Sequence, residues 1–563
     1  MIFNRMFGYV LRYKGVFAAL LLCSASAGLL SVYAPVLIGR GVDMAASADK
    51  SKLPILLLTL GAVFALTALF AYLTSVCSLT ICTKVVARLR REVFDRLTGL
   101  PLSYLDAASK GDVMSRAAND IDTVGDGLSG LLGTLFSGVL ILIWAIVFML
   151  RMSVPITLLV LLVTPLSVWI SRFIARRSQG QFRKQSAAMG ELSGLTEEVI
   201  GTQRISRIFG YRDTAQQRFD SINKSLYHSG QKSQFYSSLS NPATRLVNNI
   251  AYVLVGVASG FGAGLSIGSV AAFLSYAVLF GRPINDITSI FVQLQGALAS
   301  MARVFALIDE PPEQDSGTES LTAKGHIVFE NVSFSYSPNK PLIQNLSLEV
   351  KPGSTVAIVG PTGGGKTTLV NLLMRFYEPN SGRILIDGVD VQTVTRDSLR
   401  QSFGMVLQDT WLFSGSIFEN IAYGKTGAAR EEVEEAARKA GAHDFIVRMP
   451  QGYDTQIGGV TGNLSQGECQ LLTIARAMLS SPPMLILDEA TSAVDSLTEQ
   501  KINRAFDLLM KGKTSFVIAH RLSTIVNSDL ILVVDKGNVV QRGDHKTLSA
   551  QEGLYAELYR AGV

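Results

Sequence analysis

Long apolar stretches fill the first half of this chain and alternate with basic, polar segments. Runs without any charged residue cover 15–39, 53–82, 128–150, 153–171 and 246–281. A helix needs about 20 apolar residues to cross the hydrocarbon core of a bilayer. Each of the first four runs therefore predicts one membrane span. The fifth is longer and carries glycines at 260, 262, 264 and 268, so it predicts two helices and brings the total to six.

The N-terminus also resembles a secretory signal peptide. Arg5, Arg12 and Lys14 precede an apolar run that contains Ala25-Ser26-Ala27, a pattern typical of a cleavage site. The apolar run continues beyond that site to Gly39. We therefore expect a retained first span.

Basic residues indicate the orientation of the spans. Segment 84–116 holds seven Lys and Arg residues and segment 172–245 holds twelve, whereas the other loops between spans hold few. Positive charge marks cytoplasmic loops. We therefore expect the N-terminus, both basic segments and the C-terminal half to face the cytoplasm, with the chain in the inner or plasma membrane of the cell.

Composition agrees with a membrane protein. Charged residues make up 17% of the chain and hydrophobic residues 48%, against about 25% charged residues in soluble domains. The net charge of +6 follows from the basic cytoplasmic loops, so we expect a lipid bilayer and no nucleic acid as a partner. The four cysteines, which are too scattered for a disulfide framework or a zinc site, are Cys23, Cys77, Cys82 and Cys469.

The pattern changes after Asp309. A polar, proline-bearing linker is predicted over 311–320, and from 321 onward short apolar strands alternate with helices. The sequence thus predicts an α-helical transmembrane domain over 1–310, with long cytoplasmic extensions of its helices, followed by an α/β domain over 321–563.

A phosphate-binding loop follows the strand predicted at 355–359. The sequence matches G-x-x-x-x-G-K-[ST] between a strand and a helix, which is the context that the motif requires. Its backbone N–H groups and the helix N-terminus attract phosphates, the lysine reaches the outer phosphates and the threonine hydroxyl ligates Mg²⁺. The residues are Gly360, Pro361, Thr362, Gly363, Gly364, Gly365, Lys366 and Thr367, with Thr368 as a further nucleotide contact. We expect ATP and Mg²⁺ as ligands of this P-loop NTPase domain.

Two further elements belong to the same chemistry. A buried strand at 484–487 ends in Asp488 and Glu489, which are placed to hold Mg²⁺ and to polarise a water. Between this strand and the loop, Ser465 and Glu468 form an S-x-x-E capping box, and Ser465 and Gly467 at a helix N-terminus are also suited to bind a γ-phosphate. Both roles are compatible, because a cap orients the donors that an anion needs.

Leu464-Ser465-Gln466-Gly467-Glu468, placed between the phosphate loop and Leu485-Ile486-Leu487-Asp488-Glu489, resembles the ATPase domain of ABC transporters. Six spans before it resemble the half-transporter layout of bacterial multidrug ABC exporters. The segment from Tyr104-Leu105-Asp106 through Gly111-Asp112, Arg116 and Asp120 is similar to the family's first cytoplasmic loop, which docks on the ATPase.

The resemblance implies roles for individual residues. Tyr336 would stack on adenine, Gln408 would link Mg²⁺ and the γ-phosphate to the membrane domain, and Asp495 would contact the opposite subunit. Glu489 would be the catalytic base and His520 the γ-phosphate switch, with Thr367, Gln408 and Asp488 around the metal. The signature acts in trans in this family, so Ser465 and Gly467 would complete the ATP site of a second half-transporter chain.

Two departures from the family pattern concern that second chain. The usual signature is Leu-Ser-Gly-Gly-Gln, whereas this chain has Gln466 and Glu468 at the third and fifth positions. Segment 457–462 also lacks the charged residues common before the signature. These departures favour a heterodimer, as in exporters with one impaired ATP site, and leave a homodimer open.

The cargo is predicted only as a class. Arg282 and Asp286 share a face of the sixth span, either as a structural ion pair or as a polar spot on a substrate cavity. Tyr276 and Phe280 are aromatic candidates for the cavity wall, which would suit hydrophobic or amphiphilic compounds. The predicted function is ATP-driven export by alternating access. An importer on the same scaffold, for example for siderophores, and a nucleotide-gated channel or sensor stay open.

Overall fold

The computed structural model describes residues 2–47, 51–260, 266–337, 340–408, 410–458, 464–488, 495–519 and 522–561. The chain folds into two compact units. The first comprises 1–99 and 108–310, and the second comprises 311–563 together with the short segment 100–107. That short segment, although it lies within the membrane half of the sequence, groups with the C-terminal unit.

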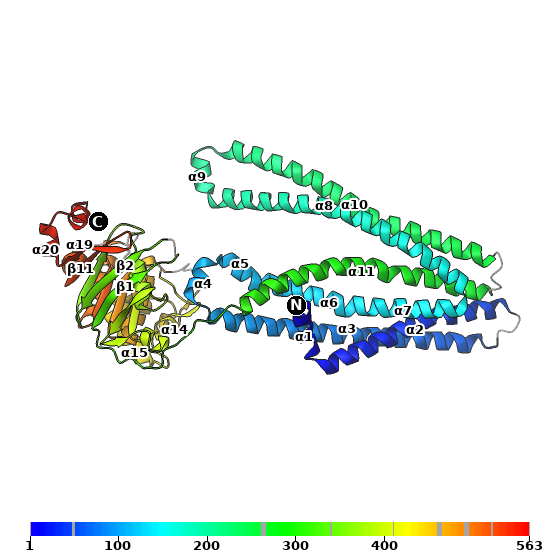
Figure 1. Ribbon diagram of the computed structural model, residues 1–563, viewed down its shortest axis with the longest axis horizontal. Coiled ribbons are helices and arrows are strands. Elements are labelled where there is room, and N and C mark those ends of the chain that lie inside the picture. Colours follow the sequence, from blue (N-terminus) through cyan, green and yellow to red (C-terminus); the bar gives the residue numbers. More distant parts are fainter. Residues whose placement is uncertain are drawn as a thin grey trace. The chain divides into compact units, whose positions relative to one another are not determined.

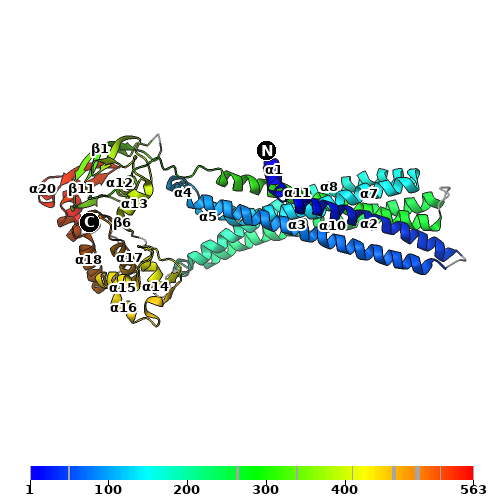
Figure 2. The same ribbon diagram turned by 90° about the horizontal axis from the view of Figure 1, so that it is seen from below.

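The first unit is built of helices that run lengthwise beside one another (Figure 1, Figure 2). Short turns or short helices connect the long helices. From α5 to α7 the chain is continuously helical and includes two π-helical segments, η1 and η2. The elements are α1 (Ile2–Leu11), α2 (Lys14–Ala46), α3 (Leu53–Thr98), α5 (Lys110–Ser115), η1 (Arg116–Asp120), α6 (Ile121–Ser129), η2 (Gly130–Leu135), α7 (Phe136–Met152), α8 (Val154–Gly201), α9 (Gln203–Ile208), α10 (Arg212–Gly260) and α11 (Ile267–Ile308).

Three helices among the described residues are long and apolar enough to cross a membrane, namely Lys14–Ala46, Leu53–Thr98 and Lys110–Met152. The other three predicted spans fall in α8, α10 and α11, which have 48, 49 and 42 residues and contain shorter apolar stretches. At 1.5 Å per residue a 46-residue helix such as α3 is about 70 Å long, more than twice the bilayer core. The expected helical extensions beyond the membrane are therefore present. Helix α2 also runs unbroken through Ala25-Ser26-Ala27.

Helices α2 and α11 touch through their backbones. A Cβ atom added to Gly268 would lie 1.9 Å from the carbonyl oxygen of Gly39, and one added to Gly39 would lie 2.5 Å from that of Gly268. Beside this contact the Asp43 carboxylate accepts hydrogen bonds from Gly268 N and Ser266 Oγ, both at 2.7 Å, and so caps the N-terminus of α11. Small residues are thus what allows these two helices to pack.

The second unit contains a six-stranded sheet in the order β12-β11-β3-β10-β9-β6, in which only β12 is antiparallel to its neighbour. A four-stranded antiparallel sheet in the order β2-β1-β4-β5 and a two-stranded β7-β8 ribbon complete it. The strands are β1 (Ile327–Phe334), β2 (Ile343–Val350), β3 (Thr355–Val359), β4 (Ser381–Ile386), β5 (Val389–Asp390), β6 (Phe403–Val406), β7 (Gly415–Ser416), β8 (Gln456–Ile457), β9 (Met484–Asp488), β10 (Thr514–Ile518), β11 (Leu530–Asp535) and β12 (Asn538–Gly543).

Alternate residues of the parallel strands enter two different hydrophobic cores. In β3, Val356 and Ile358 belong to the core shared with the antiparallel sheet, whereas Ala357 and Val359 belong to the core beneath the helices. This alternation follows from the two-residue period of a strand buried on both faces. The helices of this unit are α4 (Leu102–Ala107), α12 (Lys366–Leu373), α13 (Arg396–Gln401), α14 (Ile417–Ala422), α15 (Arg430–Lys439), α16 (His443–Val447), α17 (Gln466–Ser480), α18 (Ser496–Met510), α19 (Leu522–Val526), α20 (His545–Ala550) and α21 (Leu554–Ala561).

The predicted linker is part of this second unit. Thr318 N and Glu319 N donate to Thr393 O, and Thr395 N donates back to Glu319 O, so the segment pairs with the chain after β5. Residues 311–320 are therefore hydrogen-bonded to the α/β fold.

The contact between α2 and α11 gives a stability prediction. Gly268→Ala should lower the free energy of unfolding by about 1–3 kcal/mol, because the new methyl group meets backbone on the facing helix and the helices must separate. Gly256→Ala is the matched control, since nothing lies within 4 Å of its added Cβ. Thermal unfolding of the purified protein in detergent checks this, and equal midpoints for the two variants would contradict it.

Candidate nucleotide-binding site

The phosphate loop connects β3 to α12 and depends on two glycines. Gly360 has φ +151° and Gly365, the residue before α12, has φ +103°. A Cβ atom on Gly360 would lie 2.0 Å from Val534 O, and one on Gly365 would lie 2.9 Å from Gly537 Cα. The loop is thus pressed against the end of β11 and the following turn, where only glycine fits.

Lys366 is held at the mouth of this loop. Its side chain is 8% exposed, and Nζ donates hydrogen bonds to Gly360 O at 2.6 Å and Pro361 O at 3.2 Å. Burial lowers the pKa of Lys366, while the nearby Asp488 carboxylate acts in the opposite direction. The ammonium group therefore lies where backbone oxygens and a carboxylate converge, beside the N-terminus of α12, and is positioned to meet phosphate oxygens.

The sheet brings Asp488, which was predicted as a metal ligand, to the edge that carries the phosphate loop. Strands β3 and β9 flank β10, and the register pairs Ile518 of β10 with both Ile358 and Asp488. All three strands are parallel, so the loop after β3 and the carboxylate at the end of β9 share the carboxyl edge of the sheet. Thr367 is exposed at that edge. A hydroxyl and a carboxylate are ligand types that suit Mg²⁺, so these residues fit the metal.

Tyr336 lies beside α12. Its hydroxyl donates to Thr368 Oγ1 and accepts from Asn371 Nδ2, both at 3.2 Å. The ring of Phe334 meets that of Tyr336 edge to face, with centroids 4.8 Å apart, and half of the Tyr336 surface remains exposed. The structure thus brings together two residues, Tyr336 and Thr368, that were predicted separately as nucleotide contacts.

The capping box at the start of α17 is present. Ser465 Oγ accepts from Glu468 N at 3.3 Å, while the Glu468 carboxylate accepts from Ser465 N at 2.8 Å and from Ser465 Oγ at 2.9 Å. The helix N-terminus therefore already holds an anion of its own chain. Gly467 is buried behind it.

The other residues predicted for this site lie on separate elements or outside the described residues. Gln408 follows β6 and is exposed, and Asp495 caps α18 by accepting from Leu497 N and Thr498 N. Those bonds, the one from Thr498 first, lower the pKa of Asp495. Glu489 and His520 lie outside the described residues, as do the side chains of Arg282 and Asp286.

Tyr276 and Phe280 lie in the interior of the helical unit. Tyr276 is fully buried and its hydroxyl donates to Val32 O at 2.7 Å, three residues before Pro35 within α2. Phe280 packs in the same core. The structure gives both side chains a packing role, and their contact with a substrate stays a prediction.

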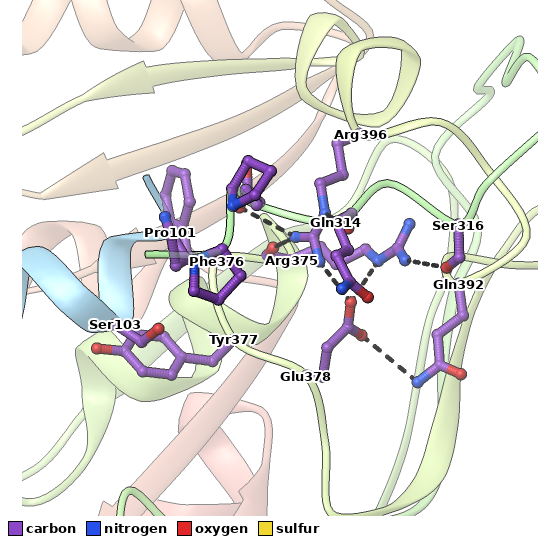
Figure 3. Close-up of a pocket in the computed structure, with 13 residues that line it drawn as sticks. Pro101, Ser103, Gln314, Ser316, Arg375, Phe376, Tyr377, Glu378, Gln392 and Arg396 are labelled. Carbon is purple, nitrogen blue, oxygen red and sulfur yellow. Dashed lines mark hydrogen bonds and ion pairs between the residues drawn. The ribbon is translucent and has the colours of Figure 1, made fainter. Parts of the chain in front are cut away.

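No sequence motif pointed to the residues directly after α12. Arg375, Tyr377 and Glu378 line a cavity of about 510 Å³ (Figure 3), where Tyr377 bonds to Asp106 of α4 and Arg375 to Ser316 of the 311–320 segment. Their position next to the phosphate-loop helix was the available signal. An aromatic cluster formed by Trp411, Phe413 and Tyr423 on the same unit was missed as well. The Arg476 guanidinium lies 5.4 Å from the ring centroids of Phe413 and Tyr423 and donates to the backbone carbonyl of Trp411.

Comparison with known proteins agrees with this site. The family profile of the ABC transporter transmembrane region matches residues 17–284 and the ABC transporter ATPase profile matches residues 343–492. A fatty acid ABC transporter ATP-binding/permease protein of Mycobacterium bovis is 45% identical over 529 residues, covering 93% of this chain and 83% of that protein.

Further relatives are similar over nearly their whole length. An ATP-dependent lipid A-core flippase of Methylobacillus flagellatus is 39% identical, covering 91% of this chain and 88% of the flippase. A solved structure of a bacterial Atm1-family ABC exporter with ATP bound has a TM-score of 0.78 and 32% identity, covering 98% of each chain.

The capping box leads to a prediction for ATP turnover. Glu468→Gln should raise the apparent affinity for ATP about 2- to 5-fold, because it removes a negative charge from a helix N-terminus suited to phosphate. Glutamine also completes a capping box, so α17 itself should stay intact. The ATP dependence of phosphate release measures the effect. Glu432→Gln, in the exposed N-terminal turn of α15, is the control; an unchanged or weaker affinity in Glu468→Gln would contradict the prediction.

Proposed function

Because this chain belongs to the ABC transporter family, we propose that it exports amphiphilic lipids, such as long-chain fatty acids, as one half of a dimer. It is an integral membrane protein that binds ATP and couples ATP hydrolysis to export. The observation that carries the substrate class is that relatives covering most of this chain are named for fatty acid and for lipid A-core. The multidrug-like cargo predicted from the sequence is the broader form of the same proposal.

The proposed mechanism follows from the residues at the carboxyl edge of the sheet. Phosphates bind the backbone N–H groups of the loop, and Lys366 exchanges its carbonyl partners for phosphate oxygens. Thr367, Asp488 and Gln408 would hold Mg²⁺, which neutralises charge on the phosphates. Glu489 accepts the proton of the attacking water and His520 donates to the γ-phosphate. Closure of the site and release of the products alternate the access of the membrane cavity.

A dimer is supported by two apolar surfaces that water would otherwise cover. Around α9, Ile200, Ile208 and Phe209 are 71–80% exposed, beside a cavity of about 740 Å³. On the ATPase unit, Trp411 and Tyr423 are each 67% exposed. Apolar patches of this kind mark interaction sites. We assign α9 of one chain to the aromatic cluster of a second half-transporter. The signature departures favour a different second chain, and a homodimer is the other outcome.

Transport is tested in proteoliposomes with radiolabelled palmitate. The purified transporter, with any co-purifying second chain, should move palmitate from the face that carries the ATPase unit when Mg-ATP is added. Glu489→Gln should abolish turnover and transport while ATP still binds, because the proton acceptor is lost. Transport by Glu489→Gln at the wild-type rate would remove Glu489 as the base. Uptake in the opposite direction would indicate an importer, and ion current without ATP use would indicate a channel.

The dimer contact is tested on the aromatic cluster. Trp411→Glu should lower ATP turnover about 10-fold, because a charge replaces a ring that would be desolvated in the interface. Binding of ATP to the phosphate loop should persist. Val540→Glu is the control, since Val540 is also exposed but lies on β12 outside the cluster. Equal turnover in the two variants would contradict the contact, and native mass spectrometry distinguishes one chain type from two.

A further inference from the structure

Helices α8 and α10 run beside each other (Figure 1) and form a cavity of about 430 Å³ between them. Its floor is made of small side chains, since Ala188 and Ser229 are only 5% and 7% exposed. Short side chains let the two helices approach closely, so the longer ones stand around the depression. These longer side chains are polar or charged and belong to Gln181, Lys184, Glu191, His228 and Lys232. The cavity is therefore a polar site and offers little surface to an acyl chain.

Lys184 and Lys232 line the same part of this cavity from opposite helices. Gln185, which follows Lys184, accepts a hydrogen bond of 2.5 Å from Ser233 Oγ. A Cβ atom added to Gly230 would lie 3.8 Å from Gln185 Nε2. Gln185 thus faces the two positions that flank Lys232 on α10. The two lysines are therefore at the same level along this pair of antiparallel helices.

Neither lysine is neutralised within the chain. Among the described residues of α8 and α10, the only ion pair joins Arg218 to Glu198 at 3.4 Å. Segment 172–245 as a whole carries twelve Lys and Arg residues but only five Asp and Glu residues. Like charges at one level repel each other, and an anion placed between them would turn that repulsion into attraction.

The donors around the cavity favour a phosphate group over a carboxylate. A phosphate monoester carries a charge of about −1.5 to −2 at neutral pH, which matches two ammonium groups, whereas a carboxylate carries a single charge. The His228 ring, the Ser225 hydroxyl and the Gln181 amide offer further hydrogen-bond donors. Glu191 lies seven residues beyond Lys184 on α8, about 10 Å along the helix. Its carboxylate repels anions from that end of the cavity and so confines them to the lysine end.

The position of the cavity along the helices indicates where the anion comes from. Arg172 and Arg245 are the first charged residues after the apolar stretches of α8 and α10, and Lys184 and Lys232 lie 12 and 13 residues from them, toward α9. At 1.5 Å per residue this is about 18–20 Å. The headgroup layer of a bilayer is only about 5–8 Å thick on each side. The cavity therefore lies beyond the headgroups, in water.

We propose that this cavity is a binding site for a dissolved anion that carries a phosphate group, with Lys184 and Lys232 as its two cationic ligands. The bound anion bridges α8 and α10. The site is separate from the phosphate loop, and it depends neither on the proposed cargo nor on its direction of movement.

The reactivity of the two lysines tests the site directly. The full-length transporter in phosphatidylcholine nanodiscs is treated with an acetylating reagent, without nucleotide, and the modified lysines are quantified by peptide mass spectrometry. Pyrophosphate at about four times its dissociation constant should slow acetylation of Lys184 and Lys232 about 5-fold, because only the unoccupied site reacts. Lys110, which is exposed on α5, should react at an unchanged rate.

Matched variants separate this site from a general effect of charge. Lys184→Gln should weaken the protection of Lys232 by pyrophosphate about 10-fold in apparent affinity, because one of two charged hydrogen bonds is lost. Arg183→Gln is the control, since it removes the same charge from an exposed position of α8 outside the cavity. Glu191→Gln should raise the affinity about 2- to 5-fold by removing the repelling carboxylate. Lys366→Ala, which disables the phosphate loop, should leave the protection as it is.

Three results would overturn the inference. The first is no protection of Lys184 and Lys232 by pyrophosphate. The second is equal protection by sodium chloride at the same ionic strength, which would show screening in place of binding. The third is protection in nanodiscs that contain phosphatidylglycerol but none by pyrophosphate, which would assign the lysines to lipid headgroups. Protection by pyrophosphate in neutral nanodiscs, weakened in Lys184→Gln and kept in Arg183→Gln, supports the site even if palmitate is never transported.

Discussion

The length of the helices relative to the thickness of a bilayer constrains everything else in this transporter. Helices of 42–49 residues are about 63–74 Å long, whereas the hydrocarbon core is about 30 Å thick. More than half of each helix therefore lies outside the hydrocarbon. Only part of each helix can therefore contact the hydrocarbon, and the remaining turns are available for contacts with polar surroundings.

The ATPase fold is built around a sheet that is packed on both faces. Residues of β3 and its neighbours alternate between two cores, so the sheet is packed on both faces and cannot slip. Its parallel strands place the phosphate loop and Asp488 at one edge. Helix α12, which follows directly from the phosphate loop, packs against this sheet through Leu369, Val370 and Leu373. Interiors packed in this way transmit displacement.

Local sequence patterns predicted much of the fold and part of the nucleotide site. The strand at 355–359 and the loop after it were predicted correctly, because glycines, lysine and threonine at fixed spacing are needed for phosphate whatever the context. The six long helices follow from apolar runs, and the capping box from Ser465 and Glu468. The contacts of Tyr377 were not predictable, because Asp106 is distant in sequence and only the fold brings them together. Tyr276 was predicted as a cavity residue, yet its hydroxyl donates to Val32 O of α2, a partner that only the fold brings within reach.

The capping box at the start of α17 bears on a requirement of the proposed transport cycle, which is that the closed state be reachable and also reversible. A helix N-terminus free of anions would favour phosphate strongly, and the site would open slowly after hydrolysis. Here Ser465 is already bonded to Glu468 of its own chain, so a phosphate that binds Ser465 as we propose would have to displace an internal acceptor. The net gain on the proposed closure would then be the difference between two similar interactions. A ligand shifts a conformational equilibrium only by its differential affinity for the two states. In the proposed mechanism, the strength of the internal cap between Ser465 and Glu468 would therefore set how far ATP drives closure.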